Sequence, residues 1–570
     1  MRIALVTFYD GAGSGVRVLG SLAQSKGHEV RLFILHHFRI IENNTPLQCP
    51  NAMQSICNGS FRVKKSDVYP ITEHEIELCI AALVEGQYDL IALSSRSTDM
   101  PEALRLITRL RQTLPQVRLI AGGHGPTYNP EAYLKSGVSW IVRGEGEGAF
   151  LDILDALHQQ KDCAAIKNLA FLTPGGLQCN ELRPFIRHFD ALPLPLISND
   201  HVVYIEDNTA SCKDPQAGLR RYGTALGRGC IGKCTYCGSE SWNRLVSATS
   251  GCGALYRHKP FDKFLDELEQ AKENGAQYIV FNDEYLVLSL PDMLRLFTAY
   301  KKRIDLPFSV NLHPRQLLDN TELFEAVLEA GLDAFTIGFQ SGSEEFSRTI
   351  FHRALRFDQL LTLASRLYER DIAIASHFIS GATFNTDEEW YSKLRLVSQI
   401  PFDPMNSRHS MIMDFQYMPT PGSRLCEATN HRRIPTEEWA QRALCVQLRH
   451  IATDSEFEET VQSLNGTSPQ ELARRYALIK QKRAEEYRQN VIALCKTAET
   501  AIIYDDTASA DHRKHLADLL PKARLLHVRG LSSSSFSSGT TVICLSKNTL
   551  ALSKTIKKYS FRKVFAWASE

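Results

Sequence analysis

The stretch GRGCIGKCTYCGSESW, residues 227–242, carries the most informative pattern in the chain. It places Cys230, Cys234 and Cys237 in a CxxxCxxC spacing on one short segment. The chain holds 14 cysteines in 570 residues. At that density, random placement predicts only about 0.01 such patterns per chain. We therefore expect the three thiols to act together as ligands.

Three thiolates on one loop can hold three irons of a 4Fe–4S cube, because soft sulfur ligands suit iron–sulfur clusters. The fourth iron then has no protein ligand and can bind a further molecule. A structural zinc site is the alternative, since zinc needs a fourth ligand and Cys252 and His258 follow the loop. The other cysteines show no ligand spacing among themselves, and in a reducing cytosol they are expected to be buried or inert.

Strand and helix signals alternate on the carboxyl side of this loop. Helical patterns at 261–274 and 320–330 lie among strand-like runs at 278–281, 308–312, 334–339, 373–379 and 411–417. Alternation of this kind is typical of a parallel sheet covered by helices. Five or six such units in about 200 residues predict a full or partial (βα)6 barrel, which we assign to residues 224–430.

A second alternating series fills residues 1–160. Strands are expected at 2–8, 29–35, 90–94, 117–121 and 140–143, with helices at 16–26 and 101–113. This is an α/β pattern that predicts a doubly wound, Rossmann-type parallel sheet, whose ligands bind at the carboxyl ends of the strands. Glycine-bearing turns at 10–15, 122–125 and 144–147 are expected to share that edge.

The remaining segments are less informative. Residues 161–223 contain several prolines and predict a connecting segment. Residues 431–500 are charged and predict helices, and residues 501–570 predict a small α/β region with a flexible serine-rich loop at 532–538. Strands of that region are expected at 501–504, 524–528, 541–545 and 563–567, with a helix at 512–520.

Bulk composition excludes some classes of partner. A formal net charge of +1, with 44% hydrophobic and 23% charged residues, gives no electrostatic case for nucleic acid or an anionic membrane. The first apolar run is too short for a signal peptide, and no run approaches 18 apolar residues. These features predict a cytoplasmic protein with a small-molecule substrate.

The cysteine loop and the barrel-like series resemble the radical S-adenosylmethionine (SAM) superfamily. Supporting segments are GFQSGS at 338–343, HFISG at 377–381 and MPTPGS at 418–423. The resemblance implies that SAM binds the open iron and that an electron cleaves it to a 5′-deoxyadenosyl radical. It also implies an electron donor such as flavodoxin or ferredoxin.

The resemblance further implies a set of SAM contacts. Tyr236 would shield the cluster and touch the adenine, and Asp283 and Glu284 would accept the SAM amino group. Gln340 stands where glutamate is commoner in the family, so its ribose contact departs from the usual pattern. The residues assigned to SAM are Tyr236, Asp283, Glu284, Gln340, Ser341, Gly342 and Ile379.

Residues 121–147, AGGHGPTYNPEAYLKSGVSWIVRGEGE, resemble the cobalamin-binding domain that is fused to a large radical SAM subgroup. Glycines at strand ends would let the backbone approach a flat macrocycle. A Rossmann-like domain that serves only as scaffold is the alternative. The residues assigned to cobalamin are Asp10, Gly11, Ala12, Gly13, Ser14, Gly15, Ser94, Ser95, Gly122, Gly123, His124, Gly144, Glu145 and Gly146.

The first glycine turn bears on the lower ligand of cobalt. Cobalamin proteins that supply a histidine there carry DxHxxG after the first strand, and Ala12 occupies the histidine position in this chain. The resemblance thus implies that this loop gives cobalt no imidazole. His36 and His37 are alternative ligands, whereas His124 is expected to contact cobalamin without ligating cobalt.

Together the resemblances cover about residues 1–425 and imply a cobalamin-dependent radical SAM methyltransferase that acts on an unactivated carbon. Two alternatives remain. One is a radical SAM enzyme that catalyses cyclisation or rearrangement without methyl transfer. The other is a cobalamin-binding sensor or scaffold with an inert barrel, which would have no need of the intact CxxxCxxC pattern.

Replacing any one of Cys230, Cys234 or Cys237 with alanine should abolish formation of 5′-deoxyadenosine, because each thiolate fixes one iron. The measurement is chromatography of anaerobic reactions with SAM and dithionite, alongside the iron content of each variant. Cys252→Ala is the matched control and should keep the cluster absorbance. Loss of the cluster in that control would instead favour a four-ligand site.

Overall fold

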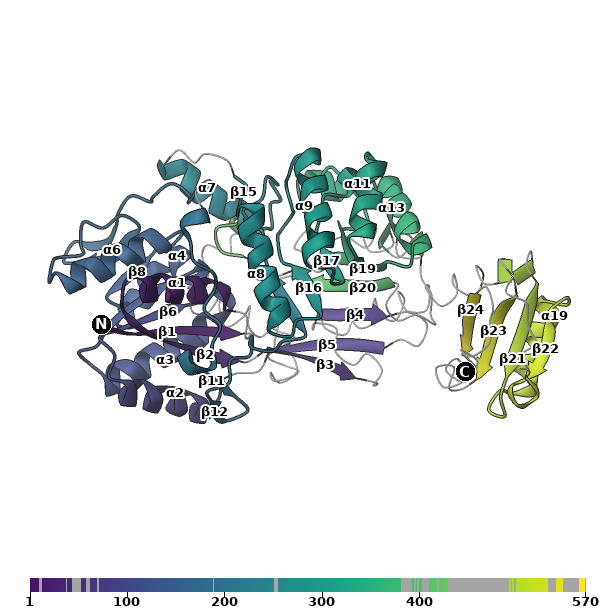
Figure 1. Ribbon diagram of the computed structural model, residues 1–570, viewed down its shortest axis with the longest axis horizontal. Helices are drawn as coiled ribbons and strands as arrows, with labels where there is room; N and C mark the ends of the chain where they lie inside the picture. Colours follow the sequence, from purple (N-terminus) through teal and green to yellow (C-terminus); the bar gives the residue numbers. More distant parts are fainter. Residues whose placement is uncertain are drawn as a thin grey trace.

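The computed structural model contains three units built on parallel strands, which Figure 1 shows in a row from the amino to the carboxyl terminus. The described residues are 1–9, 13–36, 38–43, 53–57, 62–68, 71–187, 189–250, 255–380, 392–393, 396, 399–401, 410–417, 420–428, 489, 492–493, 495–496, 499–531, 540–546 and 563–568. The expected helices at 431–500 lie largely outside this set, and the loop at 532–538 lies wholly outside it.

The amino-terminal unit is a nine-stranded sheet in the order β10-β9-β8-β7-β6-β1-β2-β11-β12. Its strands are β1 (Arg2–Tyr9), β2 (Glu29–His36), β6 (Leu90–Ser94), β7 (Arg118–Gly122), β8 (Trp140–Val142), β9 (Leu169–Thr173), β10 (Gly176–Cys179), β11 (Val202–Glu206) and β12 (Thr209–Ser211). The run from β8 to β11 is parallel. This confirms the predicted doubly wound, Rossmann-type sheet.

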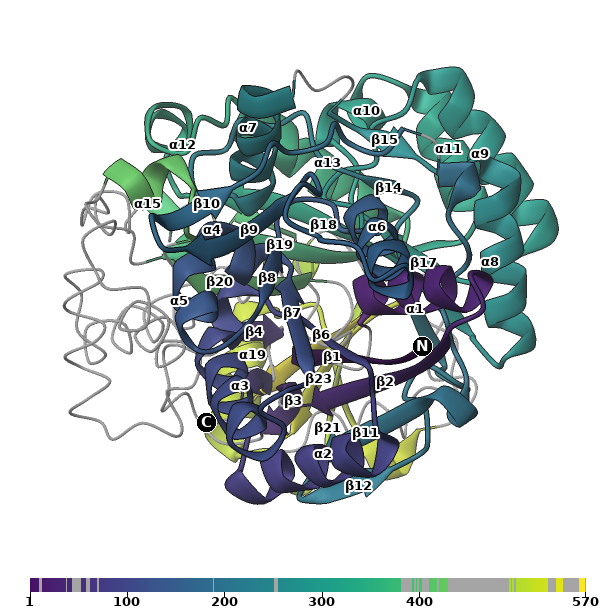
Figure 2. The same cartoon turned by 90° about the vertical axis from the view of Figure 1, so that its left-hand side faces the viewer.

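Helices cover both faces of this sheet. Helices α1 (Ser14–Ser25) and α6 (Glu147–His158) pack on one face, and α2 (Glu73–Gly86) and α3 (Met100–Thr113) pack on the other. Figure 2 looks at this unit end-on, with α1 and α6 above the strands and α2 and α3 below them. Two separate apolar cores result, one on each face.

Strands β9 to β12 come from a segment that its composition marks mainly as a connector. They are three to five residues long, too short to show a clear period of two. Their backbone groups nevertheless find partners at the two edges of the sheet. The sheet therefore extends beyond the five strands that the sequence predicts.

The central unit carries six parallel strands in chain order, as expected for the partial barrel. They are β13 (Arg221–Thr224), β16 (Tyr278–Phe281), β17 (Phe308–Val310), β18 (Leu332–Gln340), β19 (Ala373–Ser380) and β20 (Ser410–Gln416). Helices α8 (Phe261–Glu273), α9 (Leu290–Arg303), α11 (Thr321–Glu329) and α13 (Phe357–Glu369) cover the outer face.

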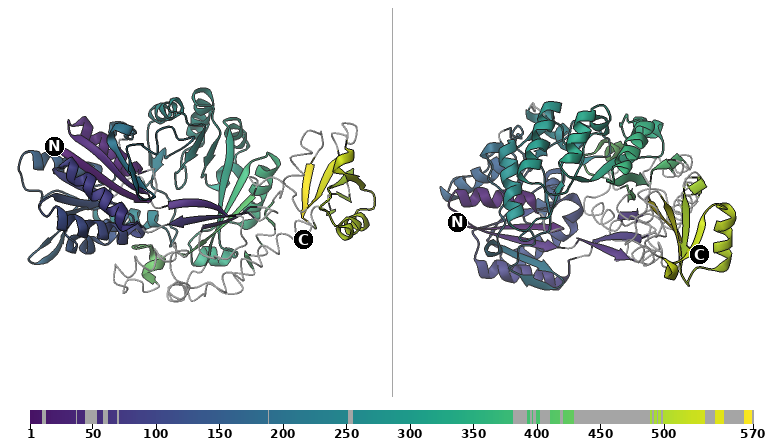
Figure 3. Two further views of the ribbon diagram at one scale, coloured as in Figure 1. Left: turned by 90° about the horizontal axis from the view of Figure 1, so that it is seen from below. Right: turned by 45° about the vertical axis from the view of Figure 1, so that its right-hand side comes forward.

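Three antiparallel strands extend this second sheet, and the sequence does not reveal them. They are β3 (Phe38–Asn43), β4 (Met53–Cys57) and β5 (Arg62–Val68), which lie between β2 and α2 in the chain. Strand β4 pairs with β20, so the amino-terminal unit supplies the next strands of the barrel sheet. Figure 3 shows these strands beside the barrel when the molecule is seen from below. They cover the edge of β20, which would otherwise present unpaired backbone groups.

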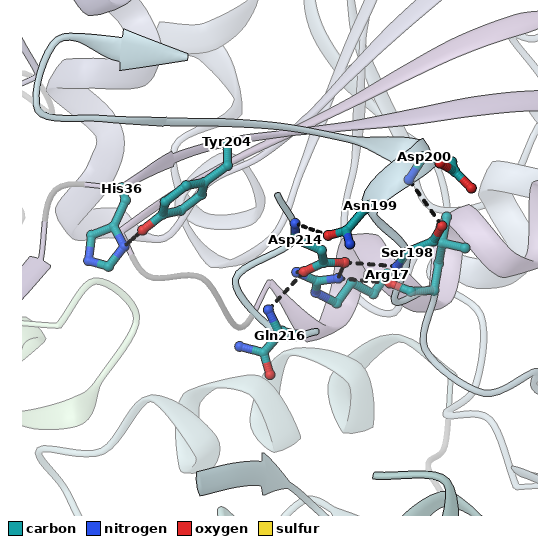
Figure 4. A network of polar contacts seen from close by, with 9 residues as sticks. Arg17, His36, Ser198, Asn199, Asp200, Tyr204, Asp214 and Gln216 are labelled. Atoms are coloured by element: carbon teal, nitrogen blue, oxygen red, sulfur yellow. Dashed lines mark hydrogen bonds and ion pairs between the residues drawn. The ribbon is translucent and has the colours of Figure 1, made fainter. Parts of the chain in front are cut away.

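A buried ion pair fastens the connector to α1. Arg17 and Asp214 meet through two contacts of 2.7 Å, and Arg17 also donates to the carbonyl of Leu196 at 2.8 Å. The Asp214 carboxylate further accepts the backbone N–H groups of Ser198 and Gln216. Figure 4 shows the Asp214 carboxylate between the guanidinium of Arg17 and the backbone donors of Ser198 and Gln216. The connector is therefore fixed against the first helix.

The carboxyl-terminal unit is a parallel sheet in the order β22-β21-β23-β24. Its elements are β21 (Thr500–Tyr504), α19 (Ala510–Leu519), β22 (Arg524–His527), β23 (Thr541–Ser546) and β24 (Lys563–Ala568). These match the expected strands and helix to within about two residues at each end, the usual uncertainty of element boundaries. Among the described residues, no helix is long and apolar enough to cross a bilayer.

The register of β4 against β20 can be tested by a designed cross-link. Met411 lies opposite Cys57, and paired antiparallel residues have Cα atoms about 4.5–5.5 Å apart, within disulfide range. The variant M411C should form a disulfide with Cys57 on mild oxidation, detected by non-reducing peptide mass spectrometry. In M413C the new cysteine lies opposite Ser55 and should not cross-link. Equal cross-linking in both variants would contradict this register.

Candidate functional site

A cavity of about 630 Å³ lies between the amino-terminal sheet and the barrel. One wall comes from turns at the carboxyl ends of β6, β7 and β8 and from the first turns of α1 and α6. The opposite wall comes from the end of β13, the root of the cysteine loop and the end of β16. The cavity thus joins most of the residues assigned to cobalamin with the root of the cysteine loop, and Glu284 is the residue assigned to SAM that lines it.

The amino-terminal wall contains most of the residues that the sequence assigns to cobalamin. Those that line the cavity are Ser14, Gly15, Ser94, Gly122, Gly123, His124, Gly144, Glu145 and Gly146. A Cβ added at Gly15 would meet no protein atom within 4 Å. Apolar side chains, among them Ile120, Val142 and Phe150, form the floor. Open glycine backbone above an apolar floor fits a large, partly apolar macrocycle with a tail.

Several other predicted cobalamin residues stand elsewhere. Ser95 is 2% exposed, and its hydroxyl is hydrogen-bonded to Tyr133 at 2.8 Å, so it faces the protein interior. Gly13 has a left-handed φ of 47° and precedes α1 as its N-cap. Asp10, Gly11 and Ala12 lie outside the described residues.

Histidines near the cavity differ in their surroundings. His36 is hydrogen-bonded to the hydroxyl of Tyr204 and is not among the lining residues (Figure 4), while His37 is outside the described set. His124 lines the cavity and is bonded through Nδ1 to Ser97 at 2.7 Å. Its Nε2 is buried without a hydrogen-bond partner in the described part of the chain. Burial lowers the pKa of His124 to about 4, so the ring is neutral near pH 7.

The cysteine loop is held at its root by a short two-stranded antiparallel ladder. Strand β14 (Gly227–Arg228) pairs with β15 (Arg257–His258). The loop leaves β14 and runs into α7 (Gly238–Ser250). A Cβ at Gly232 would lie 3.3 Å from the sulfur of Cys230 and 3.7 Å from that of Cys234. The two sulfurs therefore gather around Gly232, where a larger side chain would obstruct them.

The chemistry of this donor set fits an iron–sulfur cluster. Burial raises the pKa of the free Cys230 thiol to about 11 and also raises the pKa of Cys237, so thiolates at neutral pH need a cationic partner. Within the described residues, no three His, Cys, Asp or Glu side chains converge on one metal position. Thiolates that each bind a different iron need not converge. Cys252, the proposed fourth zinc ligand, lies outside the described residues.

Arg353 stands beside the cysteine loop, and the sequence gives no signal for it. Its guanidinium lies 3.9 Å from the Cys234 sulfur and donates to the Tyr285 hydroxyl at 2.8 Å and to the Gly338 carbonyl at 3.1 Å. It therefore joins the loop to the ends of β16 and β18. A positive charge at this distance stabilises negative charge on the loop sulfurs.

The acidic pair after β16 divides into two different environments. Asp283 is 1% exposed and accepts the backbone N–H groups of Leu226 at 3.0 Å and Gly227 at 2.8 Å. Burial raises the pKa of Asp283 to about 6, and these donors oppose that rise. Glu284 is exposed, lines the cavity and accepts the Ser239 hydroxyl at 3.0 Å. Of the two, only Glu284 is among the residues that line the cavity.

The remaining predicted SAM residues do not line the cavity. Tyr236 packs edge-on against Phe351, with 4.8 Å between the two ring centres. Both rings belong to an apolar cluster that includes Ile379. Gln340 ends β18 with a φ of 66°. Ser341 and Gly342 are buried, and a Cβ at Gly342 would lie 2.0 Å from the backbone nitrogen of Lys393. Glycine is therefore required at position 342 by packing.

Family models match two parts of the chain. Residues 59–154 match the B12 binding domain, and residues 224–397 match the Radical SAM superfamily. Both matches agree with the sequence prediction. The cofactors that they imply are cobalamin, a 4Fe–4S cluster and SAM, and the donor sets described above fit these groups.

Curated relatives share low identity with this chain. An uncharacterized methyltransferase of Pyrococcus horikoshii is 21% identical over 377 residues, covering 64% of this chain and 75% of the relative. The anaerobic magnesium-protoporphyrin IX monomethyl ester cyclase of Synechocystis is 24% identical over 281 residues, covering 48% of this chain and 52% of the relative. The chain thus spans about half the length of the second relative.

Solved structures share the fold over most of this chain. The radical SAM methyltransferase TsrM of Kitasatospora setae, solved with tryptophan and a SAM analog, is 15% identical with a TM-score of 0.54, and 76% of each chain is covered. The cobalamin-dependent radical enzyme OxsB, solved with aqua-cobalamin and SAM, is 14% identical with a TM-score of 0.52. That match covers 91% of this chain and 75% of OxsB.

Substitutions at the acidic pair should separate SAM binding from loop anchoring. Glu284→Gln should weaken SAM binding by about tenfold, since a charged hydrogen bond contributes about 1.5–3 kcal/mol. Asp283→Asn should instead lower cluster content, because it disturbs the acceptor for Leu226 and Gly227. Equilibrium dialysis with SAM and iron analysis measure the two effects. Unchanged SAM affinity in Glu284→Gln would contradict the assignment.

Proposed function

We propose that this chain, a member of the radical SAM superfamily in the subgroup with a cobalamin-binding domain, is a cobalamin-dependent methyltransferase acting on an unactivated carbon of a small molecule. The observation that carries the proposal is the shared cavity. Glycine turns of the amino-terminal sheet and the root of the cysteine loop line the same space. A methyl donor and a radical source must be this close if one substrate carbon is to meet both.

Residues of this chain divide the work of holding the cofactors. When bound, the cluster and SAM supply a hydrogen-abstracting radical, and cobalamin supplies the methyl group. Cys230, Cys234 and Cys237 each hold one iron, and Glu284 accepts the SAM amino group. The turns at 122–124 and 144–146 hold cobalamin against the apolar floor.

The inner face of the barrel supports an uncharged polar substrate. Phe308, Phe335 and Ile337 pack against the outer helices, so the alternate residues of β17 and β18 face inward. The inward or strand-end polar residues of these strands and of β19 are Ser309, Asn311, His313, Thr336, Gln340 and His377. Burial lowers the pKa of His377 to about 4 and also lowers that of His313, so both rings are neutral near pH 7.

An external electron source is needed for the chemistry of the cluster. Ile231 lies between two of the cysteines and is 58% exposed, and Lys233 beside it is exposed as well. The loop is therefore accessible to a small redox protein such as flavodoxin or ferredoxin. The requirement for reduced thiols and for such a donor supports a cytoplasmic location.

A second candidate function is a radical cyclase or rearrangement enzyme that does not transfer methyl. The observation that favours it is the similarity to the Synechocystis cyclase, which extends over 48% of this chain. The two functions differ in whether a methyl group reaches the product, and an isotope experiment separates them.

Anaerobic turnover with SAM labelled in its methyl carbon should yield labelled product together with 5′-deoxyadenosine. The reaction contains reconstituted protein, hydroxocobalamin (which brings no methyl group of its own), a reductant and a neutral small-molecule fraction of cell extract. Mass spectrometry follows which molecules gain a labelled methyl, and Cys230→Ala serves as the inactive control. Products that require the active protein but carry no label would contradict methyl transfer and favour the cyclase.

A further inference from the structure

Four charged side chains meet where the two units touch. Glu145 and Glu147 belong to the glycine turn after β8. Arg228 and Arg257 belong to the paired strands β14 and β15 at the root of the cysteine loop. One Arg257 nitrogen lies 2.9 Å and 3.0 Å from the two Glu145 oxygens. Arg228 lies 2.6 Å from Glu147 and 3.6 Å from Glu145. We call these residues the interdomain ion-pair cluster.

Burial of this cluster is extensive on the Glu145–Arg257 side. The side chains of Glu145 and Arg257 are 10% and 6% exposed. Arg257 also lies 4.2 Å from the ring centre of Phe185 and donates to the carbonyl of Ile186 at 2.9 Å. The N–H of Ile186 in turn donates to Glu145 at 2.7 Å. Glu145 thus accepts from both Arg257 and the Ile186 N–H, while the Nε of Arg257 is buried without a hydrogen-bond partner among the described residues.

The interdomain ion-pair cluster connects the two cofactor sites through only a few residues. Arg228 precedes Cys230 by two residues. Gly229 between them has a φ of 91°, and a Cβ added there would lie 2.0 Å from the Leu255 carbonyl oxygen, so only glycine fits at this position. On the other side, Gly144, Glu145 and Gly146 line the cavity. A displacement of the turn would therefore be transmitted directly to the root of the cysteine loop.

We propose that Glu145 and Arg257, supported by Glu147 and Arg228, are positioning residues. They fix cobalamin in relation to the iron–sulfur cluster. This inference rests on the proposed function. Glu145 then acts through the barrel and does not bind cobalamin with its carboxylate, although the sequence places it in a cobalamin turn. The backbone of the turn remains available to the cofactor.

Ionic contacts suit this role because they specify geometry. A buried ion pair adds little net stability compared with well-packed apolar residues, since desolvation of the charges offsets their attraction. Its directional hydrogen bonds nevertheless disfavour displaced arrangements, which leave buried charges unpaired. A radical reaction between two cofactors requires a fixed separation more than it requires a strong interface.

The test compares E145Q, R257M and the double variant E145Q/R257M, with R257K as a variant that keeps the charge and E147Q as a control at the more exposed Arg228–Glu147 pair. Pulsed electron paramagnetic resonance measures the distance distribution between cobalt(II) in bound cobalamin and the reduced cluster. Equilibrium dialysis with hydroxocobalamin measures affinity. Hydrogen–deuterium exchange of segments 144–147 and 227–229 is followed in protein without added cofactors.

We expect E145Q and R257M to broaden the distance distribution alike and to raise exchange in both segments, with the double variant no worse than either single variant. R257K and E147Q should show smaller effects. Cobalamin affinity should fall by the same factor in E145Q and R257M, about tenfold or less.

Two outcomes would overturn the inference while leaving the proposed function intact. One is a loss of cobalamin affinity in E145Q but not in R257M, which would make Glu145 a direct cobalamin contact. The other is an unchanged distance distribution and unchanged exchange in both variants. Wild-type protein that retains no cobalamin would overturn the proposed function itself, and the positioning role with it.

Discussion

Charged side chains buried around the interdomain cavity are tolerated only because each one meets a partner, and this constraint fixes the shape of the cavity. Arg17 pairs with Asp214, Arg257 with Glu145 and Lys259 with Glu267, all with short, directional contacts. Unpaired, any of these charges would be strongly destabilising in such surroundings. Arg17–Asp214 holds the connector on α1 and Lys259–Glu267 lies within the barrel unit, whereas Arg257–Glu145 joins the two units directly.

The cysteine loop is ordered by the protein around it before any metal is considered. Asp283 holds its root, Asn243 donates to the carbonyl of Cys230 at 2.7 Å, and Thr235 bonds to the Ile350 carbonyl at 2.5 Å. Arg353 then approaches Cys234 from the barrel side. These anchors come from the end of β16, from α7 and from the segment 350–353, so separate parts of the barrel unit hold the loop in place. Pre-ordering of this kind reduces the entropy that cluster insertion would otherwise cost.

The long, regular elements could be predicted from the sequence because their side chains follow the period of a strand or helix. Strands β1, β2, β18 and β19 and helices α3 and α8 are examples. Strands β3 to β5 could not be predicted, since β4 pairs with β20, hundreds of residues away, and local sequence carries no trace of that partner, while β3 and β5 depend on this pairing for their place in the sheet. Arg353 was missed for the same reason: its role arises only when β18 and the loop come together. Asp283 and Glu284 illustrate a different limit, because adjacent carboxylates read alike in sequence while the fold buries one and exposes the other.

The strands that the amino-terminal unit lends to the barrel have a consequence for how this protein is made and how it evolves. During synthesis, β4 emerges from the ribosome long before β20 exists, so its edge must wait unpaired, and protection by a chaperone would be valuable in that interval. A cut between the two units would leave β20 without its neighbour. Recombination that exchanges one unit for a homologue must therefore carry residues 38–68 along with the barrel. The pairing of β4 with β20 therefore couples two units that the order of the chain alone presents as a simple tandem of domains.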